Sequence, residues 1–232
     1  MMATWASDEE LWDLARRELF TAVVGDVMDA MGLRRQFLPP EVQPLDDGMV
    51  VVGRAMPVLE MDVFADGVMD AQGGDLAKPF GLLFRALDDL KAGEVYVCTG
   101  SSPRYALWGE LMSLRAAKCG AAGAVVDGFH RDTKGILALG FPTFSRGRYA
   151  QDQGVRGKVV DWRTPLEFSN GARVEPGDVI FGDLDGVLVV PKAAEEEAFA
   201  RALEKVRGEK LVREAIEAGS TTVDAFARYG IM

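Results

Sequence analysis

The fold of this chain is decided by residues 94–126, EVYVCTGSSPRYALWGELMSLRAAKCGAAGAVV. The segment opens with a compact run rich in β-branched and aromatic residues, 94–98, and closes with a short, wholly apolar run, 123–126. Both runs predict strands, and the apolar spacing over 108–118 predicts a helix between them. A strand, a helix and a strand within about thirty residues make a βαβ unit, whose crossover is right-handed. The middle of the chain is therefore predicted to be α/β.

Helices are predicted on both sides of this unit. The first begins at a capping box formed by Ser7 and Glu10, and a second covers residues 26–31 and ends at Gly32. A helical pattern over 79–90 stops near Gly93. A long amphipathic helix, about 193–218, ends the chain, and Gly208 within it predicts a kink. No linker or repeat interrupts these elements, so we predict a single domain over residues 1–232, with N-terminal helices within 7–32.

Further strands are predicted where apolar, β-branched runs are bounded by turn residues. They fall at 49–52, 55–61, 158–162, 172–174, 179–181 and 187–190. The last four are short and separated by turn signals, which is typical of an antiparallel section. One of these turns, DLDG at 183–186, lacks the spacing and the final glutamate of a calcium loop, so it is predicted to be a hairpin turn.

Composition excludes several classes of function. The 232 residues include 26 Lys and Arg against 36 Asp and Glu, a formal net charge of −10, which disfavours nucleic acid and anionic membranes as partners. Two cysteines, Cys98 and Cys119, and the single histidine His130 exclude a disulfide framework and a four-ligand Cys/His zinc site. The first residues carry acids where a signal peptide has bases, and no apolar run approaches the ~18 residues of a membrane span. We therefore expect a cytoplasmic protein in which oxygen ligands hold any metal.

The common catalytic motifs are absent. The sequence has no Walker loop, no GxGxxG after a strand, no GxSxG elbow and no HExxH. A hydrolytic triad would have to use His130, whose Arg and Asp neighbours favour a polar loop residue instead.

One candidate site remains, between Gly109 and Asp132, where a helix begins at GELM and a strand runs out into FHRD. In a parallel βαβ unit, ligands gather at the carboxyl ends of strands and at helix N-termini. The N–H groups from Gly109 to Met112 can hold a carboxylate, Arg131 can neutralise a developing oxyanion, and Asp132 can bind a hard divalent cation. The alternative is a capped helix beside an Arg–Asp surface pair.

These residues resemble a known family. The resemblance centres on residues 108–147, WGELMSLRAAKCGAAGAVVDGFHRDTKGILALGFPTFSRG, and extends to 23–32, VVGDVMDAMG, and 174–191, VEPGDVIFGDLDGVLVVP. The segment is similar to the core of the RraA-like family, which includes class II pyruvate aldolases acting on 4-hydroxy-4-methyl-2-oxoglutarate and 4-carboxy-4-hydroxy-2-oxoadipate. The signature of the family is an acid, twenty residues and then Arg-Asp, which Glu110, Arg131 and Asp132 match.

The resemblance implies a divalent-metal-dependent lyase that cleaves a 4-hydroxy-2-oxo acid to release pyruvate and can also decarboxylate oxaloacetate. It implies that Asp132 coordinates Mg²⁺ or Mn²⁺ and that Arg131 contacts the pyruvyl oxygen. The amides of Leu111 and Met112 are implied to receive the pyruvate carboxylate. Glu110 is implied to act through water held by the metal.

The resemblance also implies the fold and the assembly. The family fold is a compact α/β/β sandwich, similar to the swivelling phosphohistidine domain, with a long C-terminal helix. Members assemble as homotrimers or hexamers with active sites at subunit interfaces. Glu209, on the C-terminal helix, is the candidate to reach a neighbouring site, against the alternative of an ordinary solvated helix face.

Two residues depart from the aldolase pattern. Glu110 stands where the aldolases usually have Asp, and Gly135 stands where they tend to have an acid, three residues after Asp132. We therefore predict metal-dependent lyase chemistry on a small 2-oxo acid without fixing which one, and we predict that His130 is a substrate contact particular to this branch.

The alternative function is a non-catalytic binding protein of the ribonuclease-regulator type, whose acidic surface would meet a basic partner. We discount a methyl-donor site and with it a methyltransferase role, because the sequence has no glycine-rich nucleotide loop followed by an acidic strand end.

Overall fold

The computed structural model describes residues 5–64 and 74–231. By their internal contacts these residues form two compact units, one of residues 35–192 and one that combines the chain up to residue 34 with the chain from residue 193 onward. The prediction of a single domain stays a prediction. None of the helices in the described ranges has the length and apolar character needed to cross a membrane.

The larger unit is built on one mixed sheet with the strand order β1-β8-β6-β4-β2-β12-β13, while β9 pairs with β2 and with β3. β2, β4, β6 and β8 are parallel neighbours, whereas β9 and β12 join β2 in antiparallel fashion. The strands of this sheet are β1 Gln43–Pro44, β2 Val51–Asp62, β3 Phe80–Gly81, β4 Glu94–Thr99, β6 Gly123–Val126, β8 Thr143–Ser145, β9 Gly157–Trp162, β12 Val179–Asp183 and β13 Gly186–Val190.

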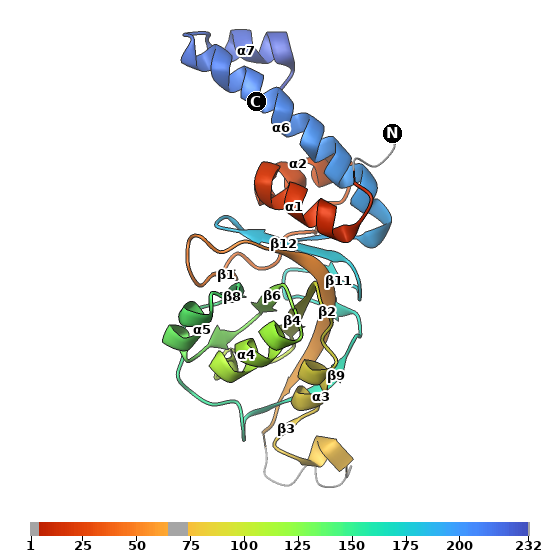
Figure 1. Cartoon of the computed structure of the whole chain (residues 1–232), viewed down its shortest axis with the longest axis vertical. Coiled ribbons are helices and arrows are strands. Elements are labelled where there is room, and N and C mark those ends of the chain that lie inside the picture. Colours follow the sequence, from red (N-terminus) through yellow and green to blue (C-terminus); the bar gives the residue numbers. More distant parts are fainter. Residues whose placement is uncertain (1–4, 65–73, 232) are drawn as a thin grey trace. The chain divides into compact units, whose positions relative to one another are not determined.

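Smaller elements complete this unit. Two ladders lie outside the main sheet: β5, Ala106–Trp108, is parallel to β7, Phe129–His130, and β10, Leu166–Glu167, is antiparallel to β11, Arg173–Val174. Three helices, α3 Leu83–Asp88, α4 Glu110–Lys118 and α5 Thr133–Leu139, lie together over one face of the sheet (Figure 1). A short 3-10 turn occurs at Gly74–Ala77, and another, Lys192–Ala194, lies where the chain passes from this unit to the smaller one.

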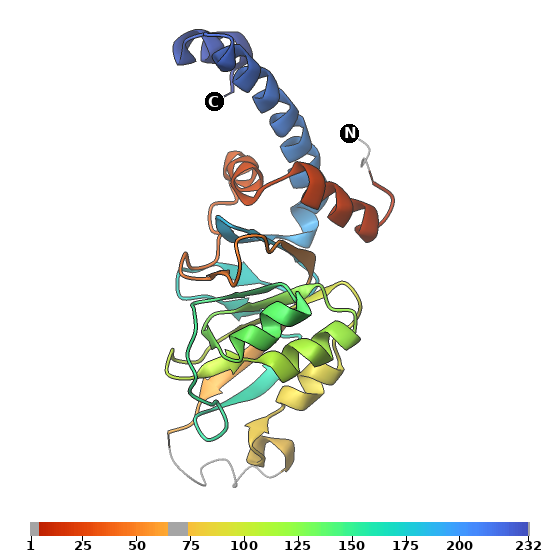
Figure 2. The same ribbon diagram turned by 60° about the vertical axis from the view of Figure 1, so that its left-hand side comes forward.

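Alternation along the central strands gives the sheet two buried faces. On β4, Tyr96 and Cys98 belong to the core under the helices, and Val95 and Val97 belong to a second core formed with β10–β13. Strands covered on both faces are expected to be almost wholly apolar, as β4 and β6 are. Helices, central sheet and further strands therefore form the α/β/β arrangement that was predicted (Figure 2).

The predicted βαβ unit is confirmed, with one shift. β4 and β6 pair in parallel on either side of α4. The helix begins at Glu110 rather than at Trp108, because Trp108 ends β5 as a buried residue. Its indole Nε1 donates to Ser113 Oγ at 2.7 Å. The hairpin turn predicted at 183–186 is also confirmed, between β12 and β13.

Two of the predicted elements differ from the structure. β2 is one strand where two were predicted, because Gly53 stays within the ladder and gives room to a neighbouring strand: a Cβ there would overlap the carbonyl oxygen of Gly93. The helix predicted over 79–90 is shorter, because Phe80 and Gly81 pair with β9 and both have positive φ angles.

The smaller unit is helical, with α1 Asp8–Glu18, α2 Thr21–Ala30, α6 Glu195–Glu217 and α7 Thr222–Tyr229. Ser7 caps α1 as predicted by accepting from Glu10 N at 3.3 Å, whereas α2 begins earlier than predicted. α6 runs unbroken through Gly208, on which Ile231 packs so closely that a Cβ would overlap it. α7 was not predicted, although Thr221 caps its start by accepting from the amide of Asp224 at 3.1 Å.

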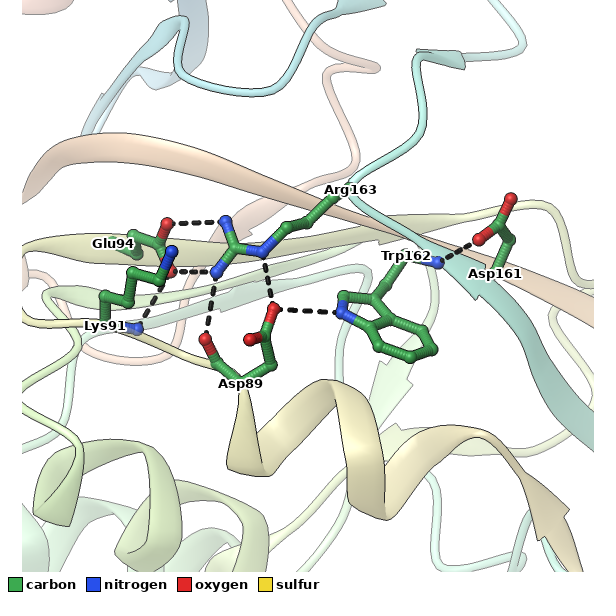
Figure 3. Close-up of polar contacts among 6 residues, drawn as sticks. All are labelled: Asp89, Lys91, Glu94, Asp161, Trp162 and Arg163. Atoms are coloured by element: carbon green, nitrogen blue, oxygen red, sulfur yellow. Dashed lines mark hydrogen bonds and ion pairs between the residues drawn. The ribbon is translucent and has the colours of Figure 1, made fainter. Parts of the chain in front are cut away.

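An arginine outside the predicted site joins β9 to α3 and β4 (Figure 3). Arg163, in the left-handed region at φ 54°, donates through Nε to Asp89 Oδ2 at 2.5 Å and through its two terminal nitrogens to Glu94 at 2.7 and 2.9 Å. Trp162 Nε1 donates to the same Asp89 oxygen at 3.0 Å. The hydrogen bond from Arg163 lowers the pKa of Asp89 below its usual value.

We expect Arg163→Met to destabilise the chain by about 2 kcal/mol, because it leaves Glu94, only 12% exposed, without its bidentate partner. Arg173→Met is the matched control, since Arg173 and Glu175 are both mostly exposed and 3.5 Å apart. Such a surface pair contributes about 0–1 kcal/mol. Chemical denaturation measures both; equal, small effects would contradict the structural role of Arg163.

Candidate active site

Two parallel strands deliver the predicted residues to one place. β5 and β7 pair with Trp108 opposite His130, and Arg131 N donates to Trp108 O at 2.9 Å. β5 continues through Gly109 into α4, and β7 continues through the Arg-Asp pair into α5. The carboxyl ends of both strands and the starts of both helices therefore meet at one edge, a common place for ligands. The strand pairing brings Glu110 close to an Arg-Asp pair that lies twenty residues further along the chain.

Each of these helix starts carries a carboxylate that lies against a glycine of the other. Asp132, in the left-handed conformation at φ 56°, places Oδ2 2.8 Å from the point where Gly109 would carry a Cβ. A Cβ on Gly135 would overlap Cδ and Oε2 of Glu110 and lie 2.6 Å from its Cγ. Both carboxylates thus occupy space between α4 and α5 that side chains at the two glycines would fill.

The carboxylates of Glu110 and Asp132 supply oxygen donors of the kind that a hard divalent cation prefers, but too few to surround it. Mg²⁺ and Mn²⁺ prefer oxygen ligands, and Mg²⁺ usually keeps several waters beside one or two carboxylates. Among the residues that the structure describes, no cluster of three or more His, Cys, Asp or Glu side chains could hold a metal. Water or substrate oxygens would therefore have to complete the coordination shell.

Arg131 is held by an acid that the sequence motif does not include. Its Nη1 lies 2.8 Å from Asp152 Oδ1, and its Nε lies 3.7 Å from Asp132 Oδ2. The side chain is 39% exposed, so part of the guanidinium remains accessible to a ligand. Sequence reasoning missed Asp152, because no spacing motif connects it to Arg131.

The first amides of α4 are available to an anion. Ser113 N makes the first helical hydrogen bond, to Gly109 O at 3.0 Å. Within the described part of the chain, nothing accepts a hydrogen bond from the N–H groups of Glu110, Leu111 or Met112, and Gly109 provides no side-chain cap. These orphan donors and the helix dipole favour a carboxylate.

A pocket of about 350 Å³ opens at the Arg-Asp pair. Besides Arg131 and Asp132 it is lined by Thr133, Arg148 and Tyr149, which sequence reasoning did not single out. Arg148 adds a second cation to a pocket in a chain whose net charge is −10. The run RGRY, immediately after β8, was the available signal.

His130 is almost wholly buried, and it is also one of the residues that line this pocket. It is 1% exposed, its Nδ1 lies 2.7 Å from Ser145 Oγ, and its Nε2 lies 3.1 Å from Thr133 Oγ1. Burial, and secondarily the charge of Arg148, lower the pKa of His130 to about 4, so the ring is neutral at physiological pH. Both ring nitrogens are engaged by neighbouring hydroxyl groups, and the substrate contact predicted for His130 stays a prediction.

Glu209 lies in the smaller unit, on α6. Its Oε1 is 3.7 Å from Lys205 Nζ in an i,i+4 pair, and its side chain is 28% exposed. The role predicted for it at a neighbouring active site, within a homotrimer or hexamer, stays a prediction.

The fold is an α/β/β sandwich, and an acid and an Arg-Asp pair meet at the ends of two parallel strands. This combination defines the class of RraA-like proteins. The model of the RraA-like family, described as Aldolase/RraA, matches residues 21–189. The chain belongs to this family.

Individual relatives support the assignment. The chain is 31% identical, over 90% of its own length and 90% of the other, to a protein of Halalkalibacterium halodurans named "Putative 4-hydroxy-4-methyl-2-oxoglutarate aldolase". It is 27% identical to protein DlpA of Legionella pneumophila over 90% of this chain, and that match spans only 32% of DlpA.

Solved structures agree on the fold. An uncharacterised protein from Pseudomonas syringae has a TM-score of 0.80 at 26% identity and covers 99% of this chain and 98% of that one. RraAS2 of Streptomyces coelicolor, titled an unusual member of the RNase ES inhibitor RraA protein family, has a TM-score of 0.75 at 24% identity over 90% and 97% of the two chains. At that identity the second likeness concerns the fold alone.

Proposed function

We propose that this protein is a divalent-metal-dependent lyase that cleaves a 4-hydroxy-2-oxo acid and releases pyruvate. The observation that carries the proposal is the meeting of the α4 amides, Glu110, Arg131 and Asp132 at the ends of β5 and β7. The names of relatives, aldolases of a 4-hydroxy-2-oxo diacid, support the same reaction class.

Substrate binding would use the free amides and the arginine. The carboxylate next to the 2-oxo group accepts from the amides of Leu111 and Met112, at the positive end of α4. This orients the 2-oxo oxygen toward Arg131. The ion pair with Asp152 uses Nη1 of this arginine, and other N–H groups of the guanidinium remain to donate to the substrate. The pocket of about 350 Å³ is lined by Arg131 and Asp132 but not by the α4 amides, so it would hold only the part of this small anion that lies beside Arg131.

Bond cleavage would follow retro-aldol chemistry. A base takes the proton of the 4-hydroxyl group, C4 becomes a carbonyl carbon, and the electrons of the C3–C4 bond pass into the enolate of pyruvate. Arg131 stabilises the negative charge that develops on the enolate oxygen. Glu110 orients the water that accepts the first proton, and a proton from water then converts the enolate into pyruvate.

Asp132 would hold the metal, Mg²⁺ or Mn²⁺, with Glu110 beside it. When bound, such an ion supplies Lewis-acid polarisation of the 2-oxo oxygen. The same withdrawal of electrons would allow the C3–C4 bond of oxaloacetate to break. The C4 carboxylate would leave as CO₂, and protonation of the remaining enolate would give pyruvate.

The proposal is tested by measuring pyruvate formation from a panel of 4-hydroxy-2-oxo acids and oxaloacetate, with Mg²⁺, Mn²⁺ or EDTA. We expect release of pyruvate from at least one substrate, lost in EDTA and restored by excess metal. Activity that EDTA leaves unchanged would contradict the proposal. Absence of pyruvate from every substrate would also contradict it and would favour the ribonuclease-regulator alternative.

A further inference from the structure

A glycine is needed at position 135 because a neighbouring side chain fills the space that a Cβ would take, and not because of its backbone conformation. Its φ is not positive, since it lies in the first turn of α5, where alanine would stabilise the helix relative to glycine. The side chain of Glu110 lies where a Cβ would be, in overlap with Cδ and Oε2 and 2.6 Å from Cγ. Gly135 therefore weakens a helix of only seven residues, and what it provides in return is room for the side chain of Glu110.

The position of the Glu110 carboxylate depends on this contact. Glu110 is exposed, and its side chain makes no hydrogen bond or ion pair with any residue that the structure describes. Packing against α5 is therefore the interaction that the structure shows for this carboxylate. A methyl group at position 135 would push it away from the helix without disturbing the buried core.

Positions 110 and 135 complement each other in size across the contact between α4 and α5. This chain has a long acid at 110 and no side chain at 135, and the carboxylate of Glu110 fills the space that Gly135 leaves. A change of side-chain size at either position therefore alters the same contact.

We infer that Gly135 is a positioning residue that sets where the Glu110 carboxylate lies, so that positions 110 and 135 act as one functional unit. The inference rests on the proposed function for the role of Glu110. Gly135 has no side chain to offer a substrate or a metal, so it would act through the acid that packs on it.

A double-mutant cycle tests the inference, with Gly135→Ala, Glu110→Asp and the double variant compared to the full-length wild type. We expect Gly135→Ala to lower kcat/KM for pyruvate release by about 10- to 100-fold, while Tm stays equal or rises, because alanine favours the helix. Glu110→Asp shortens the side chain, so the double variant should recover at least about tenfold over Gly135→Ala alone.

Ala138→Ser is the matched control, because it adds one heavy atom to an exposed position of the same helix. It should leave kcat/KM within about twofold of wild type and should not couple to Glu110→Asp. Additive effects in the Gly135 cycle, or full activity in Gly135→Ala, would overturn the inference.

A second readout separates this inference from the proposed function. Mn²⁺ binding to the same four proteins, followed by electron paramagnetic resonance, should show the same non-additive pattern as kcat/KM. A wild type that binds Mn²⁺ but releases no pyruvate would contradict the lyase proposal. The coupling between positions 110 and 135 would then be judged from the Mn²⁺ affinities of the four proteins alone. Wild-type activity with an additive cycle would contradict the pairing alone. No Mn²⁺ binding and no activity would overturn both.

Discussion

Asp132→Asn is expected to lower kcat/KM for pyruvate release by about 10³-fold or more and to weaken the response to added metal. The substitution removes the charge that would hold the cation, and a loss of about 4 kcal/mol of transition-state stabilisation corresponds to this factor. Asparagine keeps the size of the side chain and tolerates the left-handed backbone found at this position, φ 56°. The fold should therefore survive, and the loss should be one of chemistry.

The control for this prediction is Asp185→Asn, in the hairpin turn between β12 and β13, where asparagine is a favoured residue. It should leave kcat/KM and Tm within experimental error of wild type. If Asp132→Asn kept activity within tenfold of wild type at saturating metal, Asp132 would not be the residue that holds the cation.

Glu60→Gln is expected to produce the largest change in stability. Glu60 lies in β2, is 1% exposed, and accepts from Gln153 Nε2 at 2.9 Å, while its Oε1 has no partner among the described residues. Desolvation raises the pKa of this carboxyl group to about 8. The folded chain therefore keeps the proton of Glu60 over a range in which the unfolded chain has lost it.

The sign of the pH dependence follows from proton binding. Between pH 4.5, the ordinary value for the group, and about pH 8, the folded state binds one more proton than the unfolded state, so stability falls as pH rises. The slope is about 1.4 kcal/mol per pH unit, which amounts to about 5 kcal/mol across the window. Glu60→Gln removes this loss, because glutamine is neutral throughout.

Urea denaturation of Glu60→Gln and wild type between pH 5 and pH 9 measures the difference. We expect the variant to exceed wild type increasingly from pH 5 to about pH 8 and the gap to level off above that. Glu167→Gln, at an exposed position of β10, is the control and should follow wild type. Parallel pH profiles for Glu60→Gln and wild type would show that the Glu60 carboxyl group titrates normally.

Glu60 also bears on the site, through two adjacent residues. Gln153, its hydrogen-bond partner, directly follows Asp152, which pairs with Arg131 at 2.8 Å. One hydrogen bond thus joins Glu60 to the segment that holds the arginine. We expect the alkaline limit of activity to lie higher in Glu60→Gln than in wild type, as measured by the pH profile of kcat/KM; an unchanged limit would contradict a connection between Glu60 and Arg131.

Local sequence patterns were sufficient for the centre of the fold. The strands at 94–98 and 123–126, the helix between them and the hairpin at 183–186 rest on periodicity and turn chemistry within a few residues, and each was predicted. The prediction divided β2 into two strands at Gly53. A glycine that lets a neighbouring strand approach closely looks the same in a sequence as a glycine that makes a turn. Only the pairing with both neighbours distinguishes the two.

The site was predictable where the chain signals it locally and not where distant segments meet. A helix start and a strand end indicated Gly109, Arg131 and Asp132, and the pairing of β5 with β7 now places them together. The contact of Arg131 with Asp152 depends on the path of a later loop, which no spacing rule describes. The packing of Glu110 on Gly135 likewise depends on the approach of two helices, so each residue alone read as an unexplained departure.

The most direct measurement of the central claim is a crystal structure of the wild-type protein with Mn²⁺ and oxalate, which resembles the enolate of pyruvate in shape and charge. The account predicts an anomalous manganese peak in direct contact with the Asp132 carboxylate, with Glu110 at its waters. One oxalate carboxylate should lie on the amides of Leu111 and Met112. A manganese ion bound elsewhere, or oxalate away from α4, would contradict the account.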